Sequence, residues 1–382
     1  MQLFAGQAQV LELAQRALAA SMNRKRAVRE LRAMAIPDDR RIADLFGIEL
    51  AVIQAPMAGA NGPEMVIAVS EAGGLGSLPG ALYAPEKLAE ALTTVRAGTR
   101  RPVNVNFFAH APAPEDAAKQ KAWWSRLAPY YAEAGIVPDC GAATNRRAAF
   151  DEDYCAIVEA FRPEVVSFHF GLPADALVAR VKRAGAKVIA SATTVAEARW
   201  LDARGVDAVI AMGAQAGGHR GNFLSDDMNG QVGTFALVPQ VVDAVRVPVI
   251  AAGGIVDRRG VVAALALGAS AVQAGTAYLF TPEAKIHAVY RAALNARDRS
   301  TAITNVFSGR PARGIVNRLM RDLGAMSVLP PPFPTAADAV APLRRAAEAA
   351  GRDDFSPLWA GESFALAQPM SAAALTRLLA GK

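Results

Sequence analysis

Residues 248–276 read PVIAAGGIVDRRGVVAALALGASAVQAGT, and this stretch decides the fold. Two runs of small and β-branched residues, 248–253 and 271–276, each end at glycine or threonine, and a helical pattern over 258–267 lies between them. A strand, a helix and a second strand in this order predict a parallel βαβ unit.

Six further runs of the same kind precede this unit. The eight expected strands are 51–57, 75–79, 102–108, 165–170, 187–192, 208–213, 248–253 and 271–276. Most are apolar on both faces, which is typical of parallel strands covered by helices. Eight such strands with helical patterns between them predict an α/β fold, a (β/α)8 TIM barrel, with a doubly wound open sheet as the alternative.

The chain has 382 residues, more than a minimal barrel needs. We expect the barrel over 41–279, a small helical subdomain over 280–356 and a C-terminal segment, 357–382, that packs on the barrel. Within the subdomain, helical patterns cover 283–294, 301–323 and 336–350.

The first 40 residues differ from the rest, with apolar residues at helical spacing followed by a basic run. We expect an N-terminal extension that is helical or partly disordered. These residues form a solvated helical extension, are added by an upstream start codon, or form a helix that docks on a surface.

Two intervals between expected strands are long, 109–163 and 214–247. Loops that follow barrel strands face the active site, so long ones are expected to form lids or substrate walls. The first interval carries four large aromatic residues, Trp123, Trp124, Tyr130 and Tyr131.

Composition narrows the class of protein. Hydrophobic residues make up 52% of the chain and charged residues 20%, which favours a large core over disorder. The net charge of +6 lies largely in the N-terminal extension, so nucleic-acid binding is not expected. Cys140 and Cys155 have no metal-ligand spacing, and neither a membrane span nor a secretion signal is evident. We therefore expect a cytoplasmic protein with reduced thiols.

Glycines end the last two expected strands, which are neighbours in a barrel. Glycine lets backbone N–H groups approach an anion closely, and a helix that starts just beyond adds positive potential. In many barrels this corner holds a phosphate. The residues expected around the phosphate are Gly253, Gly254, Gln273, Ala274, Gly275 and Thr276.

Among four histidines, His169 has the position expected of a general base, at the C-terminal end of the fourth strand. His219 follows two glycines after the sixth strand and is expected to have a structural or a substrate-orienting role. His110 follows the third strand and is a candidate for lining the mouth of the barrel, where the C-terminal ends of the strands meet. His287 is expected to be structural.

The residues that Schiff-base or metal-dependent catalysis would need are not found at the expected positions. Lys187 begins a strand, at the wrong face for a Schiff base. No HxH, HExxH or carboxylate cluster predicts a metal site. The mouth offers glycines, amides and one imidazole, which suits a bound redox cofactor.

Taken together, these segments resemble the nitronate monooxygenases, formerly called 2-nitropropane dioxygenases. The matching stretches are 54–59, 71–78, 104–108, 167–173, 213–221, 248–255, 273–276 and 308–314. The resemblance implies an FMN-dependent barrel enzyme that oxidises alkyl nitronates, such as propionate 3-nitronate, with O2 to a carbonyl compound and nitrite. It implies that His169 removes the α-proton of neutral nitroalkanes.

The resemblance also implies a set of binding residues. Expected to bind FMN are Ala55, Pro56, Met57, Asn106, Met212, Gly217, Gly218, Gly253, Gly254, Gln273, Ala274, Gly275 and Thr276. Expected to line the substrate are His219, Gln215 and His110. Met212 and Gln215 depart from the family's usual Gln and Glu, and Glu362 from its usual Gln, which leaves substrate preference open.

Two other functions stay open. A related barrel with the same FMN site would be an NAD(P)H-dependent flavin reductase of quinones or enoyl thioesters. A non-catalytic flavin-binding sensor is the alternative of another class, and the presence of His169 argues against it. The expected partners are a small nitronate or nitroalkane and O2, with the chain acting as a monomer or homodimer.

Overall fold

Eight short runs of small and β-branched residues form the central sheet of the computed structural model, which describes residues 39–112, 116–137 and 148–382. The strands are β1 (Val52–Gln54), β2 (Gly76–Pro79), β3 (Val103–Phe108), β4 (Val165–His169), β5 (Lys187–Ala192), β6 (Ala208–Met212), β8 (Val249–Ala252) and β9 (Ala271–Ala274). All neighbours pair in parallel, in the order β1-β9-β8-β6-β5-β4-β3-β2.

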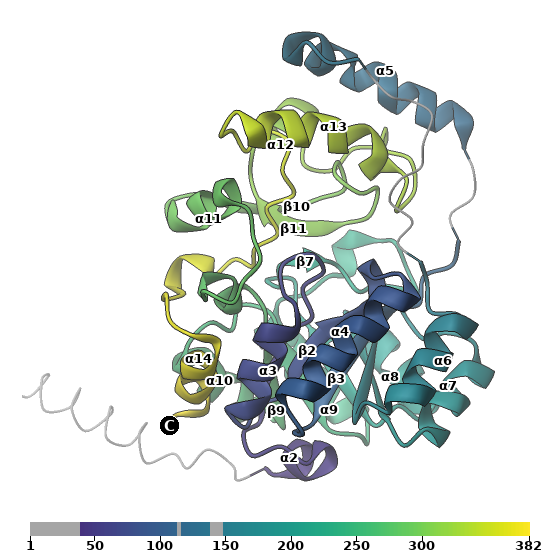
Figure 1. Cartoon of the computed structure of the whole chain (residues 1–382), viewed down its shortest axis with the longest axis vertical. Coiled ribbons are helices and arrows are strands. Elements are labelled where there is room, and N and C mark those ends of the chain that lie inside the picture. Colours follow the sequence, from purple (N-terminus) through teal and green to yellow (C-terminus); the bar gives the residue numbers. More distant parts are fainter. Residues whose placement is uncertain (1–38, 113–115, 138–147) are drawn as a thin grey trace, which may run out of the picture. The chain divides into compact units, whose positions relative to one another are not determined.

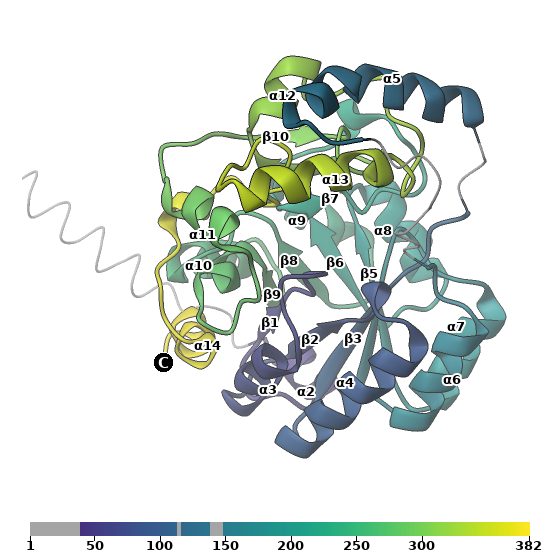
Figure 2. The ribbon, with the colours of Figure 1, turned by 45° about the horizontal axis from the view of Figure 1, so that its top comes forward.

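The two ends of this sheet meet. A parallel bridge joins Ile53 to Leu75, and the Leu75 N–H donates to the Val52 carbonyl at 3.0 Å. The sheet therefore curls into a nearly closed barrel (Figure 2), which confirms the predicted TIM barrel over the doubly wound alternative. The seventh and eighth predicted strands are β8 and β9, because the short strand β7 (Gly218–His219) lies outside the barrel sheet.

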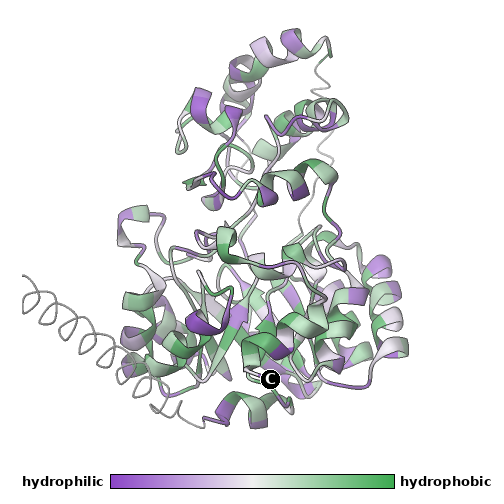
Figure 3. Cartoon of the chain, turned by 90° about the vertical axis from the view of Figure 1, so that its left-hand side faces the viewer, coloured by the Kyte–Doolittle hydropathy of each residue, from purple (hydrophilic) through white to green (hydrophobic). Residues whose placement is uncertain are grey.

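The helices cover the outside of the barrel. They are α3 (Pro63–Glu71), α4 (Pro85–Gly98), α6 (Glu152–Phe161), α7 (Asp175–Arg183), α8 (Val195–Ala203), α9 (Thr234–Ala244), α10 (Arg258–Ala266) and α14 (Ala372–Ala380). Hydrophobic and hydrophilic residues alternate along them (Figure 3), as expected of helices that pack one face on a sheet. Their apolar faces and the outward-facing strand residues form one continuous core.

A separate core fills the barrel interior. Helix α2 (Arg41–Phe46) contributes Ile42 and Phe46, which are buried together with Ile53, Val165 and Ile250 of the strands. The four short 3-10 segments of the described chain are η1 (Gly80–Leu82), η2 (Met228–Gly230), η3 (Thr276–Phe280) and η4 (Phe364–Leu366).

A second group of elements lies outside the barrel. It comprises α5 (Ala117–Ala134), α12 (Arg318–Leu323), α13 (Ala336–Ala349) and an antiparallel sheet of β10 (Thr301–Thr304), β11 (Ala312–Ile315) and β7 in that order. Helix α5 packs beside α13 (Figure 1), where Trp123 Nε1 donates to the Ala336 carbonyl at 3.1 Å and Tyr131 Oη to that of Ala339 at 2.7 Å. The sheet is a feature that the sequence analysis did not predict.

Three expectations for the segments outside the barrel need correction. The helical pattern over 301–323 is wrong for most of its length, because Gly309 and Pro311 break it and a β-hairpin forms around them. The helix expected over 283–294 is α11 (Ala288–Asn295), which starts later, with His287 as its N-cap. The aromatic residues of α5 fill the second core and do not wall the active site.

The last helix returns to the barrel. Thr376 on α14 shares a 2.9 Å hydrogen bond with the buried Tyr278 hydroxyl, and Arg258 at the start of α10 donates to the Leu379 carbonyl at 3.0 Å. Residues 1–38 lie outside the described residues, so the expected extension stays a prediction. The same holds for Cys140, whereas Cys155 is buried in the core.

Candidate active site

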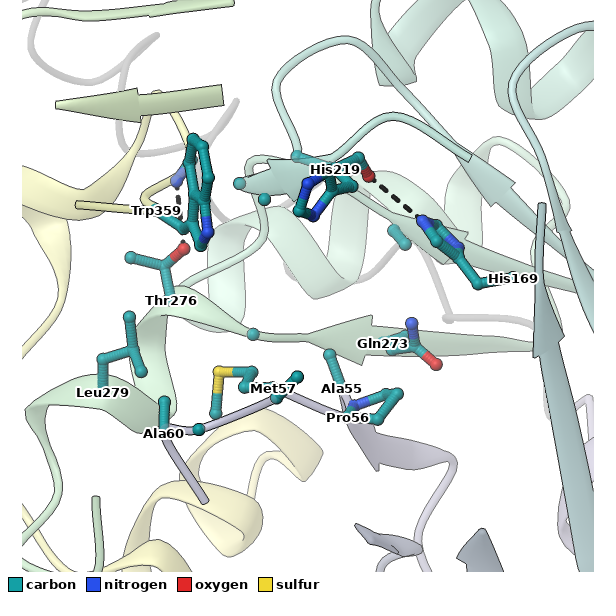
Figure 4. A pocket seen from close by; sticks show the side chains of 18 of the residues that line it. Ala55, Pro56, Met57, Ala60, His169, His219, Gln273, Thr276, Leu279 and Trp359 are labelled. Carbon is teal, nitrogen blue, oxygen red and sulfur yellow. Dashed lines mark hydrogen bonds between the residues drawn. The ribbon is translucent and has the colours of Figure 1, made fainter. Parts of the chain in front are cut away.

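A cavity of about 560 Å³ opens at the C-terminal ends of the barrel strands. It is lined by most of the residues that the sequence analysis singled out (Figure 4). These are Ala55, Pro56, Met57, Asn106, His169, Met212, Gly217, Gly218, His219, Gly253, Gly254, Gln273, Gly275 and Thr276. The barrel topology thus brings together segments that are far apart in the sequence.

Three expected residues do not line the cavity. Ala274 follows the inward-facing Gln273 and so points outward, into the core beneath the helices. The Gln215 side chain turns away and accepts hydrogen bonds from the N–H and hydroxyl of Thr234 at 2.7 and 3.0 Å. His110 packs its ring against Phe333, with the ring centroids 5.1 Å apart.

The chain after β1 forms one wall of the cavity. The Ala55 N–H donates to the Ala274 carbonyl at 2.8 Å, and the Met57 N–H donates to Asn61 Oδ1 at 2.8 Å. Asn61 is itself buried and donates to the Ser77 carbonyl at 3.0 Å. Asn61 therefore fixes this wall, although the sequence analysis missed it.

The expected phosphate corner has the backbone that glycine allows. Gly253 and Gly254 have φ values of 116° and 72°, in the region that side chains rarely adopt. A Cβ atom at Gly253 would come within 2.7 Å of Thr234 Oγ1. Helix α10 begins four residues beyond Gly254, so its N-terminus adds positive potential near this corner.

The C-terminal segment, which was expected to pack on the barrel, lies against this corner. The Gly361 N–H donates to Thr276 Oγ1 at 3.0 Å, and a Cβ at Gly217 would lie 2.5 Å from that same nitrogen. Ser363 also lines the cavity here. Arg313 forms an ion pair with Glu362 at 3.0 Å, which ties this segment to β11.

The side-chain oxygen of Gln273, in the wall of the cavity, is a candidate contact for a bound molecule. Gln273 Oε1 is buried and has no hydrogen-bond partner among the described residues. A buried acceptor without a partner is costly, so a donor from a bound molecule is expected there. Asn106, nearby in the lining, already donates to the Ser167 hydroxyl at 3.0 Å.

His169 stands at the end of β4 with both ring nitrogens engaged. Nδ1 lies 2.6 Å from Ser191 Oγ, and Nε2 lies 3.1 Å from the backbone carbonyl oxygen of His219 (Figure 4). Burial lowers the pKa of His169 to about 3, and the charges of Arg310 and Arg220 act in the same direction. The imidazole is therefore neutral at pH 7 and has a lone pair with which to accept a proton.

His219 belongs to a strap across the mouth, defined here as residues 217–221. Strand β7 within it pairs with β11, and the Arg220 N–H donates to the Pro311 carbonyl at 2.8 Å. The His219 ring lies 2.9 Å from Ser308 Oγ through Nε2 and faces the Trp359 ring. Of the long interval after the sixth strand, residues 216–219 line the cavity.

Arg220 of the strap supports the end of β6 from within the protein. Its guanidinium donates to the carbonyls of Met212 and Gly213, both at 2.7 Å. Burial lowers its pKa to about 10, which leaves it charged at pH 7. Met212 itself contributes a thioether to the cavity, where an amide would offer hydrogen bonds.

The lining of the cavity also includes Lys285, His287, Tyr290 and Arg344. His287 caps α11 by accepting from the Val289 N–H at 3.4 Å, in line with its expected structural role. In the described part of the chain, no three or more His, Cys, Asp or Glu side chains gather as metal ligands. None of the described helices is long and apolar enough to cross a bilayer.

A family model and two related proteins that match this chain carry the same description. A family model described as nitronate monooxygenase matches residues 39–381. A protein named nitronate monooxygenase from Pseudomonas aeruginosa is 44% identical over 343 residues, covering 89% of this chain and 97% of its own. One of the same name from Paraburkholderia phytofirmans is 42% identical, covering 89% and 94%.

Two solved structures are similar to this chain over most of its length. A nitroalkane oxidase from Streptomyces ansochromogenes is 36% identical, with a TM-score of 0.79 over 89% of this chain and 97% of its own. FabK from Thermotoga maritima is 29% identical, with a TM-score of 0.68 over 89% and 94%.

Proposed function

Because the chain belongs to the nitronate monooxygenase family, we propose that it oxidises alkyl nitronates with O2 at an FMN held across the mouth of its barrel. The enzyme is a flavin-dependent oxidoreductase. The observation that carries the proposal is the layout of the cavity, with a glycine corner at Gly253 and Gly254 and a neutral His169 in the same lining.

The residues present fit FMN. Gly254, Gly275 and Thr276 would hold its phosphate, because they line the same cavity and α10 begins four residues beyond Gly254. The wall formed by residues 55–57 offers a surface for the flat ring, and Gln273 Oε1 offers the ring a hydrogen-bond acceptor. The chemistry that FMN supplies when bound is the acceptance of electrons from the nitronate.

The chain's own task is to bind the substrate, exclude water and move one proton. A nitronate arrives already deprotonated and needs no base. A neutral nitroalkane must first lose its α-proton, and His169 is the group that accepts it. The nitronate anion forms beside the imidazole of His169, and its negative charge favours the imidazolium. This charge offsets part of the effect by which burial lowers the pKa of His169. His219 would orient the substrate from the strap.

Nitrite release tests this function. Purified holoprotein given propionate 3-nitronate in air is expected to form nitrite while it consumes O2, as followed by a colorimetric nitrite assay and an oxygen electrode. Boiled protein and free FMN serve as controls. Protein that forms no nitrite above these controls would contradict the proposal.

The similarity to FabK favours an NAD(P)H-dependent flavin reductase as the second candidate. That reading predicts rapid oxidation of NADH when a quinone or an enoyl thioester is present, with propionate 3-nitronate left unchanged. The higher sequence identity and TM-score of the nitroalkane oxidase support the first candidate.

A further inference from the structure

Ser191 lies at the C-terminal end of β5 and is the side-chain partner of His169. It is only 4% exposed, lines the cavity, and places Oγ 2.6 Å from His169 Nδ1. Gly221 of the strap presses on this pair, since a Cβ there would lie 2.8 Å from His169 Cε1 and 3.0 Å from Ser191 Oγ. The ring is therefore held against the hydroxyl.

The two contacts of the imidazole fix the direction of its hydrogen bonds. The His219 carbonyl can only accept, so the single proton of the neutral ring resides on Nε2 when that bond is formed. The lone pair is then on Nδ1, and the Ser191 hydroxyl donates to it.

This tautomer leaves Nε2 without a lone pair for the substrate proton. For Nε2 to act as the base, the ring proton must reside on Nδ1 and be donated to Ser191 Oγ. A hydroxyl can accept as well as donate, so turning its hydrogen accommodates both tautomers without moving the ring. A methyl group at this position would give Nδ1 a hydrogen-bond partner in neither tautomer.

We propose that Ser191 is a positioning residue that holds the base-competent tautomer of His169 and the imidazolium formed from it. The inference rests on the proposed role of His169 as the base. In the step, the Cα–H bond of the nitroalkane breaks, its electron pair stays on the substrate as the nitronate, and the proton bonds to Nε2. The imidazolium then donates from Nε2 to the His219 carbonyl and from Nδ1 to Ser191 Oγ.

The surroundings explain why this second acceptor matters. Arg310 and Arg220 are the charged groups that act on the ring, and both disfavour a cation there. The hydrogen-bond partners that the structure gives to the ring are a hydroxyl and a carbonyl, neither of them charged. Losing one of two acceptors should therefore weaken the imidazolium considerably.

Kinetics of Ser191→Ala test the proposal. The variant should lower kcat/KM for neutral nitroethane about 10- to 100-fold more than kcat/KM for ethyl nitronate, because a hydrogen bond to a charged group is lost. Ser191→Thr keeps the hydroxyl and should restore most of the wild-type ratio between kcat/KM for nitroethane and kcat/KM for ethyl nitronate. Ser70→Ala is the matched control, since Ser70 is fully buried and bonds to the Pro102 carbonyl at 2.9 Å, outside the cavity.

A second measurement does not depend on turnover. Nitrogen-15 NMR of histidine-labelled holoprotein should show a shifted His169 Nδ1 resonance in Ser191→Ala and an unchanged one in Ser70→Ala. The chain has 4 histidines, so the spectrum of His169→Asn assigns the signal.

The outcomes separate the two ideas. Equal losses on both substrates in Ser191→Ala, or an unchanged Nδ1 resonance, would overturn the role of Ser191 while leaving nitronate oxidation intact. Absence of nitronate turnover in the wild-type protein would instead contradict the proposed function.

Discussion

Replacing His169 with asparagine is expected to lower kcat/KM for neutral nitroethane by about 10²- to 10⁴-fold more than for ethyl nitronate, the range typical of a lost general base. The amide of asparagine lies near the position of the imidazole Nδ1, where it can still bond to Ser191, so the wall of the cavity should persist. The nitronate needs no proton removed, and its oxidation should therefore depend far less on residue 169.

Steady-state kinetics with nitroethane and with ethyl nitronate measure the ratio of the two kcat/KM values. His110→Asn is the matched control, because His110 packs among aromatic rings and does not line the cavity. An unchanged nitroethane rate in His169→Asn would refute the assignment of the base. The same loss of ratio in His110→Asn would show that the effect is not specific to residue 169.

Replacing Gly254 with aspartate is expected to weaken FMN binding by about 10- to 1000-fold relative to the same position as asparagine. The two side chains have nearly the same size, and both tolerate the positive φ of 72° better than other residues do. They differ in charge, and a carboxylate about 4 Å from a phosphate costs about 1–4 kcal/mol per unit charge at effective dielectric constants between 80 and 20.

Fluorescence titration of the flavin-free protein measures both affinities. Riboflavin lacks the phosphate, so its affinity should differ little between Gly254→Asp and Gly254→Asn. Equal FMN affinities of the two variants would place the phosphate elsewhere. A large difference for riboflavin would mean that the charge disturbs the ring site or the fold.

The strands and the corner were predictable because each rests on a local pattern. A short apolar run followed by glycine, as at Gly253, is set by backbone sterics and burial that neighbouring residues determine. The order of eight such runs then favours a barrel over a doubly wound open sheet. His169 was found for the same reason, since the end of a strand fixes its place at the mouth.

The second core was harder to predict because its contacts are remote in sequence. Trp123 on α5 bonds to Ala336 on α13, more than two hundred residues away, so nothing local distinguishes a core aromatic residue from a lid. The 301–323 segment shows a weak helical pattern, but pairing of β11 with β7 and the turn around Pro311 decide its conformation.

Inside the site, the errors concern side-chain direction. Gln215 and Ala274 lie in the correct segments but turn away from the cavity, toward Thr234 and the outer core. Ser191 was missed, although a hydroxyl at the end of a barrel strand was a usable signal. Trp359 reaches the cavity from the C-terminal segment, whose fold the sequence pattern did not indicate.

Anaerobic mixing of the holoprotein with propionate 3-nitronate, followed by flavin absorbance, tests nitronate oxidation most directly. The account predicts a rapid change in the flavin spectrum with the nitronate and only a slow change with NADH. Rapid reduction of the flavin by NADH, with no reaction toward propionate 3-nitronate, would contradict it.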